Sequence, residues 1–143
     1  NCTDSATGYS PTPVVLFGGD PQTATSTATY AKTAVACLNI GTYNFSWRWV
    51  YYGCLPKSAT VTFYAIRTKD NATFTLGSVT AAGANPDGSN RQGTATGSLT
   101  VTNSTDQFTF RFVWTFGSEN GYGTSCNQQA NDIGFTAPTV TCA

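Results

Sequence analysis

Two stretches of this chain place an aromatic ring at every second residue, and this alternation constrains the fold more than any other feature. Because side chains in a β-strand point alternately to opposite faces, each run predicts a strand with five rings on one face. A ring of this kind buries roughly 150–250 Å², so an uncovered run would expose more apolar surface than soluble monomers usually show. We therefore predict that the two runs face each other at the centres of two packed sheets. The rings are Tyr43, Phe45, Trp47, Trp49 and Tyr51 in the first run, and Phe108, Phe110, Phe112, Trp114 and Phe116 in the second.

Turn signals elsewhere predict further strands and no helix. Short alternating segments lie at residues 14–17, 59–68, 73–76, 98–101 and 132–136. A Lys69-Asp70-Asn71 turn joins two of them as a hairpin, and residues 81–93 and 117–131 are expected to be long loops rich in Gly and Asn. About seven to nine strands at this spacing indicate an all-β fold, an antiparallel β-sandwich or jelly roll. Its length of 143 residues predicts a single domain, residues 1–143.

The charge pattern argues against two classes of partner. The seven basic and seven acidic residues give a formal net charge of zero, and the basic ones are scattered along the chain. Neither a nucleic acid nor an anionic membrane surface is an expected partner of such a protein. No apolar run approaches the ~20 residues that span a bilayer, so no membrane insertion is expected. The chain begins at Asn1 without Met or an apolar leader, which we interpret as a mature, processed product.

Threonine and cysteine usage predict a secreted, extracellular or cell-surface location. The 26 threonines suit the pleated surface of an extracellular β-protein. The five cysteines form no Cys-x-x-Cys pair, and no histidine exists to complete a zinc site, so disulfides are expected and no metal or cofactor is. With one cysteine left over, the pairing stays open.

Four Asn-x-Ser/Thr sequons are candidate glycosylation sites: Asn1, Asn44, Asn71 and Asn103. Asn71 and Asn103 lie in polar breaks between strand patterns, where a glycan-transferring enzyme has access. Asn44 lies on the non-aromatic face of its strand, so a glycan there requires that this face meet solvent.

The residue inventory argues against an enzyme. Without histidine no Ser-His-Asp or Cys-His arrangement can form. The few carboxylates lie mostly in turn contexts, where Asp caps backbone amides. No catalytic residue is therefore expected.

At residues 39–47 the string N-I-G-T-Y-N-F-S-W resembles the G-T-x-x-F-x-W strand of β-sandwich modules in large secreted and surface, adhesin-like proteins. The likeness extends to V-V-L-F-G-G-D-P at residues 14–21, to D-Q-F-T-F-R-F at 106–112, and to N-D-I-G-F-T-A-P at 131–138, which is similar to their closing I-x-N-F-x-A-P. The resemblance implies a jelly-roll-like sandwich used for display, cohesion or adhesion, with no assigned catalysis.

The chain departs from this pattern after the first aromatic strand, where Tyr52-Gly53-Cys54-Leu55-Pro56 replaces an acidic loop. The resemblance therefore carries no calcium or ligand site over to that loop. If the loops after the two aromatic strands lie at the same end, Cys54 and Cys126 can pair. Cys2 and Cys142, near the two termini, form the other candidate pair, and Cys37 is then an unpaired, buried thiol.

Two function classes remain. A structural or adhesive surface protein, such as the subunit of a filament, coat or matrix, would associate with itself or with other surface proteins. The alternative is a carbohydrate-binding module with glycans as partners. Because the three tryptophans lie within the aromatic runs, we expect them in the core and expect a sugar to meet other residues. The candidate sugar-binding residues are Tyr52, Tyr122, Tyr9 and Tyr64, assisted by Arg48 or Arg111.

Overall fold

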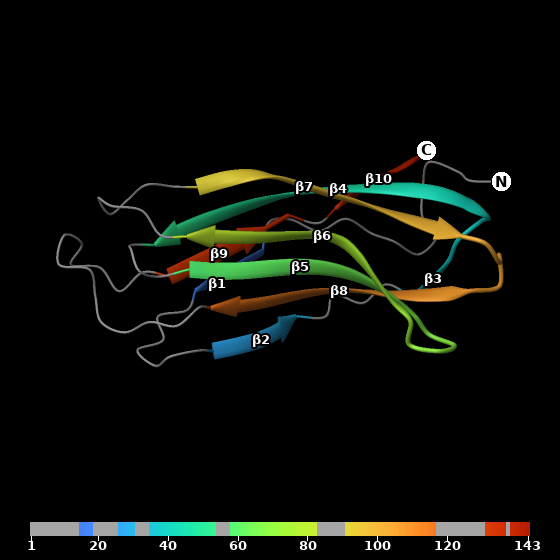
Figure 1. The fold of residues 1–143 in the computed structure, drawn as a ribbon, viewed down its shortest axis with the longest axis horizontal. Coiled ribbons are helices and arrows are strands. Elements are labelled where there is room, and N and C mark those ends of the chain that lie inside the picture. The colour runs from blue at the N-terminus through green and yellow to red at the C-terminus, as the bar shows by residue number, and fades with distance from the viewer. Residues whose placement is uncertain are drawn as a thin grey trace.

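The computed structural model describes residues 15–18, 26–30, 35–53, 58–82, 91–116, 131–136 and 138–143. These segments contain ten β-strands that run along the long axis of the molecule (Figure 1). No described segment is a helix long and apolar enough to cross a membrane. The strands are β1 (Val15–Gly18), β2 (Ser26–Tyr30), β3 (Val35–Cys37), β4 (Gly41–Gly53), β5 (Ser58–Arg67), β6 (Thr73–Ala82), β7 (Arg91–Val101), β8 (Gln107–Phe116), β9 (Asn131–Phe135) and β10 (Thr139–Cys142).

The strands form two antiparallel sheets. Sheet A contains β1, β9, β10, β4 and β7, and sheet B contains β2, β3, β8, β5 and β6. β7 pairs along one edge of β4, so β9 and β10 share its other edge as two parts of one line. In the same way β2 and β3 share one edge of β8, while β5 occupies the other. If β2 and β3 are counted as one strand, and β9 and β10 as another, the ten strands act as eight. Consecutive strands of these eight lie in different sheets, except for the β5–β6 hairpin, which is the pattern of a jelly roll.

The two aromatic runs lie in β4 and β8 and face each other across the core, as predicted. Phe45 of β4 lies 5.5 Å from Phe110 of β8, and Trp47 lies 5.4 Å from Phe112 in an edge-to-face arrangement, between ring centroids. Phe135 of β9 stacks on Phe112 at 4.2 Å. Edge-to-face and offset stacks are the favoured geometries of aromatic pairs, so the runs form the centre of the sandwich.

Along one long side of the sandwich, β6 of sheet B packs closely against β7 of sheet A. The β5–β6 register shifts between Thr62 and Tyr64, which leaves Leu76 and Gly77 as a bulge, and Gly77 has a φ of +117°. The bulge lets the Trp47 Nε1–H donate a hydrogen bond to the Leu76 carbonyl, 3.0 Å away. On β7, a Cβ at Gly97 would collide with the Leu76 backbone, so only glycine permits this approach.

Several predicted boundaries were wrong. Residues 81–82 and 91–93 were expected in a loop but belong to β6 and β7, because Gly93 and Gly97 serve close packing and not a turn. Strand β4 begins at Gly41, two residues before the first ring of its aromatic run. Strand β10 was not predicted, since its Thr-Val-Thr-Cys sequence is short and half polar.

Several candidate residues lie outside the described part of the chain. Asn1, Cys2, Cys54, Cys126 and Tyr122 belong to segments that the structure does not describe, and so does Tyr9. For Cys37 and Tyr52 only the backbone in β3 and β4 is described.

Candidate functional site

The outer side of sheet A carries a continuous array of hydroxyl and amide groups. Alternate residues of β4, such as Tyr43, Phe45 and Trp47, are buried, so the residues between them point away from the core. Registry with β7 and β10 places matching residues of those strands beside them. We call this surface the A face. It comprises Thr42, Asn44, Ser46, Arg48 and Val50 of β4, Gln92, Thr94, Thr96, Ser98 and Thr100 of β7, and Thr136, Thr139 and Thr141.

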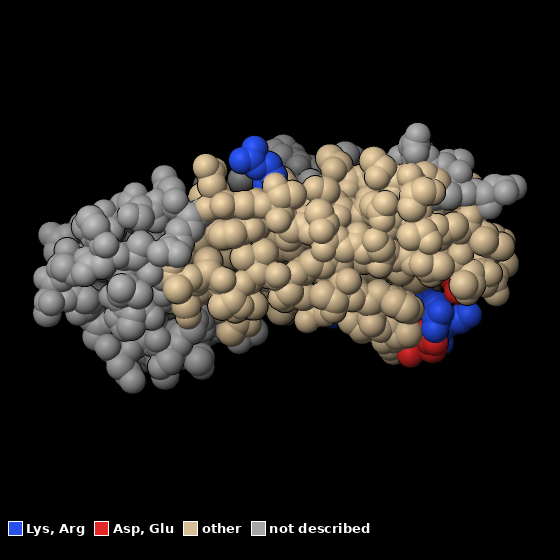
Figure 2. Space-filling model, turned by 45° about the horizontal axis from the view of Figure 1, so that its top comes forward, with Lys and Arg blue, Asp and Glu red and all other residues tan. Residues whose placement is uncertain are grey.

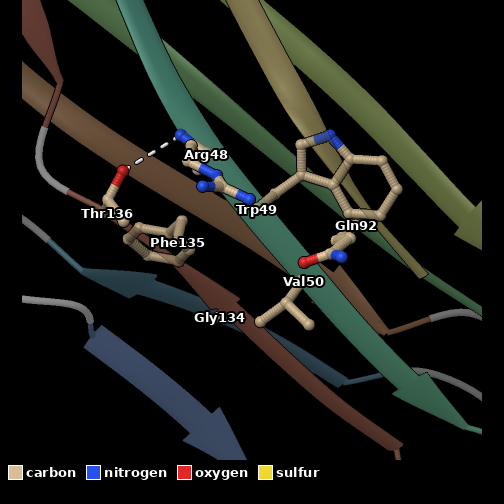
Figure 3. A pocket seen from close by; sticks show the side chains of 7 residues that line it. All are labelled: Arg48, Trp49, Val50, Gln92, Gly134, Phe135 and Thr136. Carbon is tan, nitrogen blue, oxygen red and sulfur yellow. Dashed lines mark hydrogen bonds between the residues drawn. The ribbon is translucent and has the colours of Figure 1, made fainter. Parts of the chain in front are cut away.

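One shallow pocket lies over the junction of β4, β7 and β9 (Figure 3). It has a volume of about 230 Å³ and is lined by Arg48, Trp49, Val50, Gln92, Gly134, Phe135 and Thr136. Val50 pairs with Gln92 on one side and with Gly134 on the other. Because Gly134 carries no side chain, the surface is recessed there between larger neighbours.

The backbone around this pocket is held by a side-chain hydroxyl. The Thr136 N–H donates to the Arg48 carbonyl at 2.9 Å, and the Arg48 N–H donates to Thr136 Oγ1 at 3.0 Å. The hydroxyl thus takes the place of a strand carbonyl at the point where β9 ends. Neither the Arg48 guanidinium nor the Gln92 amide bonds to any described residue, and both side chains line the pocket.

A second shallow pocket, of about 310 Å³, lies further along the same face. Its lining is polar apart from Phe45 and Gly97. Ser98 Oγ donates to Asn44 Oδ1 at 2.7 Å, and Thr139 Oγ1 donates to the Ser46 carbonyl at 3.3 Å. The lining residues are Asn44, Phe45, Ser46, Thr96, Gly97, Ser98, Thr139 and Thr141.

The two pockets lie in line along β4. The β4 residues that line them, 44–46 and 48–50, are offset by four residues, or about 13 Å at the usual rise of a strand. Each is at or below the roughly 300–1,000 Å³ of a drug-sized site. This arrangement suits an extended ligand rich in hydroxyl groups better than one compact molecule.

Apart from Arg48 and Arg111, the charged side chains that the structure describes gather at one end of the molecule. Lys69 Nζ lies 2.8 Å from Asp106, whose side chain is only 3% exposed, and Arg67 binds Asp70 through two hydrogen bonds of 2.9 and 2.7 Å. This cluster is the patch where blue and red atoms meet in Figure 2. The Arg67 guanidinium lowers the pKa of the Asp70 carboxyl to about 2. Among the described residues no three His, Cys, Asp or Glu side chains form a metal-binding group.

The predicted ligand residues do not form one site. Arg48 belongs to the A face, whereas Arg111 of β8 and Tyr64 of β5 pair across sheet B on the opposite side of the sandwich. The Nε of Arg111 is buried without a hydrogen-bond partner in the described part of the chain. Of the three tryptophans, Trp47 and Trp114 are buried as predicted, but Trp49 is only partly buried and lines a pocket.

Gln92 and Thr136 were missed by sequence reasoning. Thr136 lies 88 residues from Arg48 in the chain, and only the strand register brings the two together. The sequence does hold one signal for Gln92: it is spaced two residues from Thr94, which is two from Thr96, so in a strand the three side chains share one face. This alternation assigns side chains to a face of one strand, but it does not identify the neighbouring strands.

The chain matches no protein-family model and no curated protein. Among solved structures it is similar to the CBM22-2 xylan-binding domain of Paenibacillus barcinonensis Xyn10C, with a TM-score of 0.44 and 14% identity over 73% of this chain. It is also similar to a chain of infectious bursal disease virus, Gt strain, with a TM-score of 0.45 and 11% identity over 96% of this chain. The matches span 64% of the xylan-binding domain and 31% of the viral chain. Murine APRIL is matched at a TM-score of 0.38 with 8% identity over 72% of each chain.

Proposed function

We propose that the protein is an extracellular, non-catalytic adhesive module that binds a neutral polysaccharide along its A face. The observation that carries the proposal is the pair of pockets in line on β4, with the Arg48 and Gln92 side chains lining one of them. Guanidinium, amide and hydroxyl groups match the hydroxyls of a sugar, which both donate and accept hydrogen bonds.

The charge of the A face determines the class of ligand. Arg48 is the one charged side chain among its described residues, and the face carries no carboxylate there. An anionic polymer would call for a row of basic side chains, and a basic peptide for a row of acidic ones. A neutral polysaccharide needs neither a row of basic side chains nor a row of acidic ones. Since a hydrolase of glycosides requires two carboxylates at the bond it cleaves, binding without cleavage is the proposed activity.

The test is a screen of the full chain against neutral polysaccharides. Native affinity electrophoresis in gels containing xylan, β-glucan, mannan or chitin would detect binding as retardation. We expect retardation by at least one of them, and Arg48→Ala should abolish it. Thr60→Ala changes a comparable surface position on sheet B and should leave the retardation unchanged. Equal mobility of the wild type in all gels would contradict the proposal.

A second candidate function is the subunit of a surface filament, and a different observation favours it. In the described part of the chain, no strand pairs with the outer edge of β10 (Thr139–Cys142). A sheet edge of this kind accepts a strand from another molecule. Multi-angle light scattering over a concentration series, with electron microscopy of native material, tests this. Polymers support it, and a monomer at all concentrations contradicts it.

We also propose that the fold is disulfide-stabilised. A disulfide at Cys142, at the end of β10, would fasten the last strand of sheet A. Cys2 is its proposed partner. Peptide mapping without reduction would show a Cys2–Cys142 peptide pair, whereas a Cys142 peptide joined to Cys37 would contradict the pairing.

A further inference from the structure

Two exposed sequons lie in neighbouring turns at one end of the sandwich. Asn71 is in the turn between β5 and β6, and Asn103 is in the turn between β7 and β8, both at the right-hand end of Figure 1. The Thr68 N–H donates to the Gln107 carbonyl at 2.9 Å and so ties the two turns together.

The Asn103 turn holds its sequon in a fixed shape. The Asn103 Oδ1 accepts hydrogen bonds from the Thr105 N–H at 3.0 Å and from the Thr105 hydroxyl at 2.8 Å. The oxygen of the side-chain amide is therefore directed back into the turn. The Asn103 Nδ2, the atom to which a glycan would be attached, bonds to no described residue.

Asn71 is presented by the backbone itself. Its φ of +57° lies in the left-handed region that asparagine tolerates better than most residues. The Thr73 hydroxyl donates to the Asn71 carbonyl at 3.3 Å. The residue is exposed, and its side-chain amide bonds to no described residue.

Asn44 differs from both in its surroundings. It lies within β4 and pairs with Ser98 of β7 and with Thr141 of β10, so its backbone is fixed in an extended ladder. Its Oδ1 accepts the hydrogen bond from Ser98, and the side chain lines the larger pocket of the A face. A glycan on Asn44 would cover that pocket.

We propose that the protein carries N-linked glycans on Asn71 and Asn103 and none on Asn44. The inference rests on the extracellular location within the proposed function. In the modification, a bond forms between Nδ2 and the anomeric carbon of an oligosaccharide that a polyprenyl pyrophosphate donor supplies. The bond from that carbon to the pyrophosphate breaks, the polyprenyl pyrophosphate leaves, and the Nδ2 proton passes to a base. The glycans then extend from one end and leave the A face open.

Peptide mapping of the native full-length protein tests this proposal. Peptide N-glycosidase in ¹⁸O-water converts each occupied asparagine to a labelled aspartate, which mass spectrometry locates. Label at both Asn71 and Asn103 with none at Asn44 is the expected result, and any other pattern at these three residues overturns the proposal.

Variants of the full chain secreted from a glycosylating eukaryotic cell give a second readout. Asn71→Gln and Asn103→Gln should each remove one glycan from the intact mass. Asn44→Gln should remove none, and Thr105→Ser, which keeps the sequon, should retain all. If Asn103→Gln and Thr105→Ser give the same mass as wild type apart from the substitution, Asn103 is unmodified and the proposal fails. Polysaccharide binding by the enzymatically deglycosylated protein is measured separately, so that its loss or retention reports only on the A face.

Discussion

The indole of Trp47 donates a hydrogen bond from Nε1 to the carbonyl of Leu76 at 3.0 Å and so joins sheet A to sheet B inside the core. Both residues are almost completely buried. A backbone carbonyl within a regular strand points along the sheet to its neighbour, and the bulge at Leu76 and Gly77 turns this one toward the indole. The polar atom of this buried indole is therefore satisfied.

Replacing Trp47 by Phe should destabilise the fold. The substitution keeps an aromatic ring but leaves the Leu76 carbonyl buried without its donor, which costs about 1–3 kcal/mol. Urea unfolding followed by circular dichroism measures the free energy of unfolding. Trp49→Phe is the matched control, because Trp49 is only partly buried, and it should cost less. An equal loss in the two variants would contradict the role of the hydrogen bond.

Gly97→Ala should be more damaging than its small size suggests. The added Cβ would overlap the backbone of Leu76, which cannot move away as a flexible side chain would. We expect a loss of about 1–3 kcal/mol or more, as for overpacked cores. Thermal unfolding of Gly97→Ala is compared with that of Thr96→Ala, a control at an exposed neighbouring residue of the same strand. A melting temperature equal to that of the control would argue against the close approach of β6 and β7.

The Arg67–Asp70 pair should make stability depend on pH in acid. The pKa of Asp70 is lowered to about 2 by its hydrogen bonds to Arg67, against about 3.9 in an unfolded chain. Since the folded state holds this proton less tightly, the contribution is present above pH ~4 and is lost as the pH falls toward 2. Asp70→Asn should therefore flatten the decline of the melting temperature in this window. NMR titration of the Asp70 carboxyl in Arg67→Gln should show its pKa returning upward, and an unmoved value would exclude Arg67 as the cause.

The two pockets should act as separate parts of one binding face. Thr96→Trp would fill the pocket near Asn44 without touching the pocket at Arg48. The wild type should bind long oligosaccharides more tightly than short ones, and Thr96→Trp should lose that preference while keeping its affinity for short ones. Isothermal titration with a length series of one oligosaccharide measures this. A preference for length that survives in Thr96→Trp would contradict the in-line arrangement.

The central strands were predictable because their signal is local. A period of two in aromatic residues decides both the strand and its buried face, and the contacts of Phe45 and Trp47 with β8 follow from having two such runs to cover. A glycine, by contrast, misled the prediction of a strand boundary. Gly93 ends the loop predicted at residues 81–93, but it lies in β7, where the Trp49 indole approaches it.

The candidate site was predictable only in part. Arg48 was identified from its position between rings, on the solvent side of its strand. Its neighbours Gln92 and Thr136 come from strands that are distant in the sequence, and their proximity depends on strand order. Arg111 occupies the equivalent position in the second aromatic run but belongs to the other sheet. Two arginines with the same local pattern thus lie on opposite sides of the sandwich.

The most direct test of the account is the affinity of Arg48→Ala and Gln92→Ala for the polysaccharide retained in the gel screen, measured by isothermal titration against the wild type. Hydrogen bonds to a charged group contribute about 1.5–3 kcal/mol, so Arg48→Ala should weaken binding about ten- to hundredfold. Gln92→Ala should weaken it less. Arg111→Ala removes the same charge from sheet B and should leave the dissociation constant unchanged, with unfolding curves verifying that all variants are folded. Wild-type affinity in a folded Arg48→Ala protein would contradict the assignment of the A face as the binding site.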